Sequence, residues 1–163
     1  MIIEHIAGNI SEISVSEKVV HTVEFTEEQM QKGHQRFRTQ DGVEVAISLP
    51  LEEHLRAGAL LELSDQEVVL IQAALQEVYV IRPLSAMGYG KVCYNIGNMH
   101  KKAYLSDQEI LVPYDPILKR IFDKCEEPYE IAERRITGLP ANVSAKEHAE
   151  HGHEHEHHHT SCS

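Results

Sequence analysis

Residues 85–98 read Ser-Ala-Met-Gly-Tyr-Gly-Lys-Val-Cys-Tyr-Asn-Ile-Gly-Asn, and this stretch decides the fold expected for the second half of the chain. Its apolar positions recur at the i, i+3, i+4, i+7 spacing that places them on one buried helical face: Tyr89, Val92, Cys93 and Ile96. Ser85 is a suitable N-cap, and Gly97-Asn98 is typical of a helix end. The stretch therefore predicts an amphipathic helix.

The segments around this helix complete a βαββαβ order. Val78–Ile81 predicts a strand before the helix, and residues 102–105 and 109–112 predict a hairpin after it. Asp115-Pro116 caps and opens a second helix. The apolar face of that helix is expected to contain Ile117, Leu118, Ile121, Phe122 and Cys125. With a last strand over residues 129–136, this order is typical of a ferredoxin-like domain, in which two helices cover one face of an antiparallel sheet.

The first half of the chain has the pattern of β-structure. Residues 43–49 alternate apolar and polar side chains, and Gln40-Asp41-Gly42 supplies the turn of a hairpin with residues 35–39. Further strands are expected over residues 2–6, 19–25, 60–63 and 68–71, and a short helical turn over residues 26–30. We therefore expect an α+β protein with a small all-β domain (1–74), a ferredoxin-like domain (75–142) and a disordered His-rich tail (143–163).

The tail has the composition of a metal-binding segment. Seven of the twelve histidines fall within residues 148–159, interleaved with glutamates and without a large apolar residue that could join a core. Imidazole suits Ni²⁺, Cu²⁺ and Zn²⁺ better than Mg²⁺ or Ca²⁺. A purification tag or a low-complexity tail without a role are the alternatives, but glycine and glutamate interrupt the histidines, and Thr-Ser-Cys-Ser follows them.

Composition excludes several classes of function. The formal net charge of −11 argues against a nucleic acid partner. The absence of an apolar run of membrane-spanning length or of a leader at Met1 predicts a cytoplasmic protein without a membrane partner. No catalytic motif is visible, and Gly88–Lys91 lacks the spacing of a phosphate loop, so an enzyme is not expected.

The cysteines are three, widely spaced, and form neither a disulfide framework nor a CxxC motif. Cys93 and Cys125 fall on the apolar helical faces and are expected to be buried packing residues. Cys162 lies beside the tail histidines and is a candidate auxiliary ligand.

His100 directly follows the predicted end of the first helix, so it should project from a rigid element. The sequence Ile96-Gly97-Asn98-Met99-His100, together with residues 109–115 (Glu-Ile-Leu-Val-Pro-Tyr-Asp) and Glu133-Arg134-Arg135, resembles the UreE family of urease accessory nickel chaperones. Residues 37–49 resemble the N-terminal domain of that family, so the resemblance covers nearly the whole chain. It implies that His100 binds Ni²⁺ at a two-fold dimer interface. Tail histidines would complete the coordination, and these candidate ligands are His151, His153, His155, His157, His158 and His159.

The resemblance further implies a nickel metallochaperone that delivers Ni²⁺ to the urease apoenzyme, with an accessory GTPase as a second partner. The protein would be a homodimer or a dimer of dimers around the metal, with Zn²⁺ as an alternative ion at the same site. Two other functions stay open at this point. One is a histidine-rich nickel or zinc storage or buffering protein, and the other is a metalloenzyme with a catalytic ion on His100.

Overall fold

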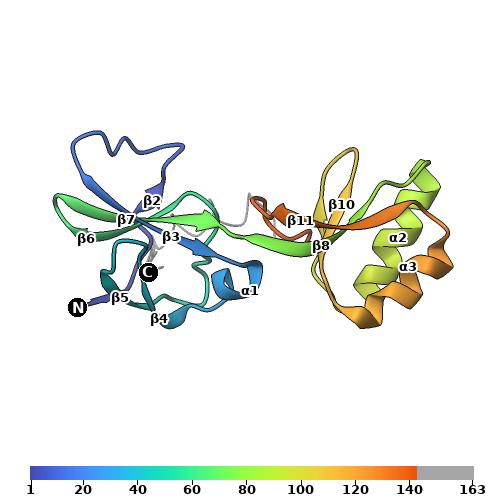
Figure 1. Cartoon of the computed structure of the whole chain (residues 1–163), viewed down its shortest axis with the longest axis horizontal. Coiled ribbons are helices and arrows are strands. Elements are labelled where there is room, and N and C mark those ends of the chain that lie inside the picture. Colours follow the sequence, from blue (N-terminus) through green and yellow to red (C-terminus); the bar gives the residue numbers. More distant parts are fainter. Residues whose placement is uncertain (143–163) are drawn as a thin grey trace, which may run out of the picture.

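The described part of the chain, residues 1–142 of the computed structural model, is an α+β protein, as the sequence predicts. Its elements form two groups side by side along the long axis of the molecule (Figure 1). In chain order the elements are β1 (Ile2–Ile3), β2 (Gly8–Asn9), β3 (Val19–Phe25), α1 (Glu27–Met30), β4 (His34–Arg38), β5 (Glu44–Ser48), β6 (Ala59–Ser64), β7 (Glu67–Ala73), β8 (Leu75–Ile81), α2 (Ala86–Asn98), β9 (Tyr104–Leu105), β10 (Ile110–Pro113), η1 (Pro116–Leu118), α3 (Lys119–Cys125) and β11 (Tyr129–Arg135).

The first group contains two sheets that enclose one core. Strands β2-β6-β7-β3 form one sheet and β1-β5-β4 the other. The predicted hairpin β4–β5 is confirmed, the strands expected over residues 60–63 and 68–71 pair as the hairpin β6–β7, and each sheet also contains one parallel pair. Phe25 and Phe37 join the sheets through an edge-to-face contact with ring centroids 5.0 Å apart. Because large side chains from both sheets are buried together, apolar burial is the main force holding this group.

The second group is a single antiparallel sheet with both longer helices on one face (Figure 1). Its strand order is β11-β8-β10-β9. Alternation along β8 directs Tyr79 and Ile81 into the core formed with α2 and α3, whereas Val78 and Val80 pack with Tyr104 on the other face. These four side chains of β8 are almost completely buried. Strand β8 is therefore the centre of this group.

The predicted helix caps are confirmed. Ser85 Oγ accepts a hydrogen bond from Gly88 N at 3.0 Å, and Asp115 Oδ1 accepts one from Ile117 N at 3.0 Å. The buried placement expected for Ile117 is wrong, because its side chain is 64% exposed. Residues 116–118 form a 3₁₀ turn with three residues per turn, so the α-helical spacing assigned to Ile117 does not apply there.

Two further expectations from the sequence need correction. The strand expected over residues 2–6 is limited to Ile2–Ile3, which pair with Ala46 and Ile47 of β5. Cys125 is buried as expected, but Cys93 is only half-buried. No helix within residues 1–142 is long and apolar enough to cross a membrane.

The two groups meet at a short junction. Only Ala74 separates β7 from β8, so the chain passes from one sheet to the other without a linker (Figure 1). Arg135 of β11 reaches back to Glu24 of β3 at 2.9 Å and also donates to the carbonyl oxygen of Ala73. At this point the two groups are joined by polar contacts between strands.

Buried His21 links the turn after β4 to the neighbouring sheet. Its Nδ1 lies 2.6 Å from Asp41 Oδ2, and its Nε2 lies 3.6 Å from Glu67 Oε1. Thr39 Oγ1 also donates to Asp41 at 2.6 Å. The hydrogen bond with Asp41 raises the pKa of His21, and the bonds from Thr39 and His21 lower the pKa of Asp41. The imidazolium is therefore held between two carboxylates.

This arrangement predicts a pH-dependent stability. Because the pKa of His21 is raised in the folded state, the ion pair of His21 contributes fully to the free energy of unfolding below the ordinary pKa of 6.5. This contribution is lost as the pH rises through the folded-state pKa. Urea denaturation should show that His21→Gln lowers the free energy of unfolding most at about pH 6, and progressively less as the pH is raised into the alkaline range. In an Asp41→Asn background this pH dependence should largely vanish. A pH-independent effect of His21→Gln would show that the ion pair contributes nothing.

Candidate metal-binding site

Helix α2 ends in a left-handed turn at His100. The amide of His100 donates to Gly97 O at 3.0 Å, and the amide of Lys101 donates to Ile96 O at 3.3 Å. This pair of bonds is the Schellman ending, in which glycine usually takes the left-handed position. Here His100 takes it, with φ of 52°. The predicted stop at Gly97-Asn98 is thus shifted, since both residues belong to α2 and His100 ends the helix.

His100 is exposed and lines an open hollow of about 540 Å³. We call this the His100 hollow. Its lining combines the end of α2, the segment that follows it and the last described residues of the chain: Cys93, Ile96, Gly97, His100, Lys101, Lys102, Ala103, Leu105, Ala141 and Asn142. The amide of Ala141 donates to Ala103 O at 2.8 Å, which fixes the end of the described chain against this wall.

The cations beside His100 are paired with carboxylates. Lys101 Nζ lies 2.7 Å from Asp115 Oδ2, and Lys102 Nζ lies 3.2 Å from Glu27 Oε1. The hydrogen bond from Lys101 lowers the pKa of Asp115, so this carboxylate stays ionised. The pairing reduces the repulsion that two free ammonium groups would exert on a divalent cation near His100.

The described residues do not supply a complete metal site. Within residues 1–142 no group of three or more His, Cys, Asp or Glu side chains is arranged to hold a metal ion. Cys93 lines the same hollow, but burial raises the pKa of its thiol and disfavours the thiolate that binds metals. Of the histidines expected to bind metal, the structure places His100 alone. His151, His153, His155, His157, His158 and His159 lie outside the described residues, as does Cys162.

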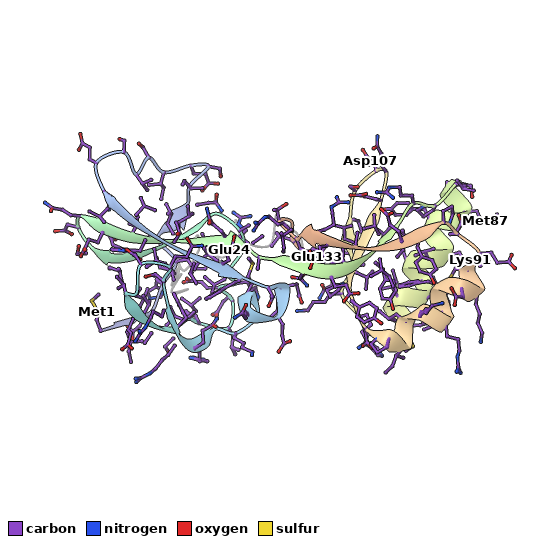
Figure 2. All side chains as sticks on the ribbon, in the orientation of Figure 1. Met1, Glu24, Met87, Lys91, Asp107 and Glu133 are labelled. Carbon is purple, nitrogen blue, oxygen red and sulfur yellow. The ribbon has the colours of Figure 1, made fainter. Side chains whose placement is uncertain are left out.

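An exposed face of α2 leads towards His100. Met87 is 84% exposed and Tyr94 is 70% exposed. Gly90 and Gly97 lie on the same face, and a Cβ atom added at either would meet no atom within 4 Å. Figure 2 shows Met87 and Lys91 at the end of the long axis opposite Met1. This face was not predicted from the sequence, although the seven-residue spacing of Met87 and Tyr94 places both side chains on one side of a helix.

Comparisons with known proteins agree with this architecture. Residues 3–74 match the profile of the UreE urease accessory protein, N-terminal domain, and residues 76–160 match that of the C-terminal domain. The chain is 30% identical over 156 residues to the urease accessory protein UreE of Staphylococcus saprophyticus, covering 94% of this chain and all of that protein. It is 29% identical to UreE of Staphylococcus aureus strain Newman over the same length and coverage.

These matches define a protein of urease maturation, an accessory protein rather than an enzyme. The chain belongs to the UreE urease accessory protein family.

The backbone at His100 gives a test that does not depend on metal. A side chain in the left-handed region is strained, and glycine is free of that strain. We expect His100→Gly to be more stable than His100→Ala by about 1 kcal/mol, although glycine usually destabilises a helical segment. Chemical denaturation of both variants measures the difference. If His100→Ala were the more stable variant, His100 would not occupy the left-handed position in solution.

Proposed function

We propose that this protein is a nickel metallochaperone that binds Ni²⁺ through His100 and tail histidines and delivers it to apo-urease. Family membership supports a role in urease maturation. The exposed imidazole at the end of α2 supports a metal-binding role for His100, because a rigid helix fixes its backbone while leaving the ring accessible. Ni²⁺ is the expected cargo, and Zn²⁺ is an alternative ion at the same ligands.

The hydrogen bond between Ala141 N and Ala103 O carries this proposal. It holds Ala141, next to the last described residue, in the wall of the His100 hollow, beside the one candidate ligand within the described residues. His151 follows Asn142 by nine residues, which span at most about 30 Å when extended. The tail histidines are therefore within reach of His100 in the same subunit.

We further propose that the protein is a homodimer with α2 at the interface. A two-fold axis beside α2 would bring a second His100 to the site without a further histidine in the sequence. The exposed Met87 and Tyr94 give this face apolar contact area, and Gly90 and Gly97 allow close approach of another helix. Location at the end of the molecule leaves the β-rich half free of that interface (Figure 2).

The remaining parts of the proposal concern organisation and partners. The order β11-β8-β10-β9 with both helices on one face supports a ferredoxin-like domain over residues 75–142. Residues 1–74 would form the domain that docks partner proteins, and residues 143–163, which lie outside the described residues, would form a metal-capturing tail. The partners would be apo-urease and an accessory GTPase in the cytoplasm. Dimers could assemble further around the shared metal.

A nickel or zinc buffer is the alternative function, because the histidine content of residues 148–159 would store ions without His100. The metalloenzyme alternative does not hold, because the chain belongs to a family of accessory proteins. Asp115 lies near the His100 hollow but is bound to Lys101 and to the amide of Ile117, so this carboxylate is not free to act as a general base.

Calorimetric titration with Ni²⁺ separates the chaperone from the buffer. We expect His100→Ala to abolish the tightest site and to leave weaker sites on the tail, since one ligand from each subunit is lost. A chain in which the tail histidines are replaced by asparagine should keep about one site per dimer. Unchanged tight binding by His100→Ala would contradict the proposal and favour the buffer.

The dimer interface is tested with a charge on the exposed face of α2. Tyr94→Asp should weaken dimerisation by at least about tenfold, because an aromatic contact would be replaced by an unpaired carboxylate. Sedimentation velocity over a range of concentrations measures this change. Leu51→Asp is the matched control, because Leu51 is 92% exposed in the other half of the molecule. Equal behaviour of the two variants would remove α2 from the interface.

A further inference from the structure

The segment that follows His100 is held by a residue of the other half of the molecule. Glu27 Oε1 accepts a hydrogen bond from the Tyr104 hydroxyl at 2.7 Å and pairs with Lys102 Nζ at 3.2 Å. The amide of Glu27 in turn donates to Gln76 Oε1 of β8 at 2.8 Å. One residue of α1 thus contacts two side chains of the segment 102–104 and one of the central strand.

This contact is sheltered from water. The side chain of Glu27 is only 11% exposed, and Tyr104 is 7% exposed. Burial raises the pKa of the Tyr104 phenol, so its proton stays in place and its hydroxyl donates to the carboxylate. Glu28, which follows Glu27 in α1, is 83% exposed and pairs with Lys32, two residues beyond the end of that helix. Charged hydrogen bonds of this sheltered kind are stronger and more specific in geometry than exposed ion pairs.

The segment 100–104 links His100 to Ala141, the residue that precedes the last described one, through a backbone hydrogen bond. Lys101 is bound to Asp115, and Ala103 O accepts the amide of Ala141. Lys102 and Tyr104, which flank Ala103, are the residues that Glu27 holds. Release of Glu27 would therefore remove a side-chain contact on each side of the peptide that anchors Ala141, while the pairing of Tyr104 with Leu111 of β10 would stay. The distance between His100 and the root of the tail would then no longer be fixed from this side.

We propose that Glu27 is a positioning residue for the metal site, acting through Tyr104 and Lys102 to hold the anchor of the tail beside His100. The inference rests on the proposed function and adds a route by which the β-rich half affects metal binding. A partner that displaces α1 would loosen the site. By thermodynamic reciprocity, an ion bound between His100 and the tail would stabilise the Glu27 contact.

The test uses the full chain with Glu27→Gln and Tyr104→Phe, and Glu28→Gln as the matched control. Glu27→Gln removes the charge at nearly constant shape, and Tyr104→Phe removes only the hydroxyl, so the apolar packing of the ring is kept. Ni²⁺ titration should show the tightest site weakened by up to about tenfold in both variants, the lower end of the effect of groups that hydrogen-bond a metal ligand directly, because Glu27 contacts Lys102 and Tyr104 and acts through them. Glu28→Gln should bind like the wild-type chain.

Amide hydrogen exchange at Ala141 gives a readout that a general loss of stability would not reproduce. Both variants should lose protection there, whereas the amides of the β6–β7 pair should keep theirs. Wild-type affinity in both variants, or equal weakening by Glu28→Gln, would overturn the positioning role. A failure of the proposed function would give a different result in the same titration. In that case His100→Ala, in the otherwise wild-type chain, would keep the tight Ni²⁺ site.

Discussion

The left-handed backbone of His100 is the constraint on which the arrangement of the candidate site depends. It closes α2 through bonds to Gly97 and Ile96 and turns the chain towards β9. A glycine would make this turn with less strain, so the presence of an imidazole is costly for the fold. The strain is tolerated because Val92 and Ile96 anchor α2 in the core and Lys101 binds Asp115 directly after the turn. A histidine at this position is consistent with a role that glycine cannot fill.

Patterns of period two and 3.6 gave most of the fold. The alternation in residues 43–49, the caps at Ser85 and Asp115 and the turn at residues 40–42 are local signals, and the elements follow them closely. Ile117 fails because a 3₁₀ turn changes the spacing, which the identity of residues 116–118 does not reveal. The parallel pairs β1–β5 and β3–β7 were not foreseen either, since pairing between distant strands depends on tertiary packing.

The candidate site also contains some residues that local sequence signals predict and others that they do not. His100 could be singled out because it follows a recognisable helix end. By contrast, the contact between Ala141 and Ala103 joins residues 38 positions apart through backbone atoms, and no side-chain pattern encodes it. Glu27 and Tyr104 are 77 positions apart and lie in different halves of the chain. Such pairs are determined by how the two groups of elements pack, so single-sequence reasoning had no signal for them.

The distribution of charge explains how one exposed histidine could serve a transfer function. A single imidazole holds a divalent ion weakly, and tight binding needs ligands that are brought to it. Under the proposed function, those ligands come from a second subunit and from a tail whose root is fixed at the His100 hollow. Lys101 and Lys102 would repel the ion if they were unpaired, but Asp115 and Glu27 neutralise them. Each of these carboxylates also holds a structural element in place. The same ion pairs therefore make the hollow acceptable to a cation and fix the geometry of the part of the site that the proposed ligands from the tail and the second subunit would complete.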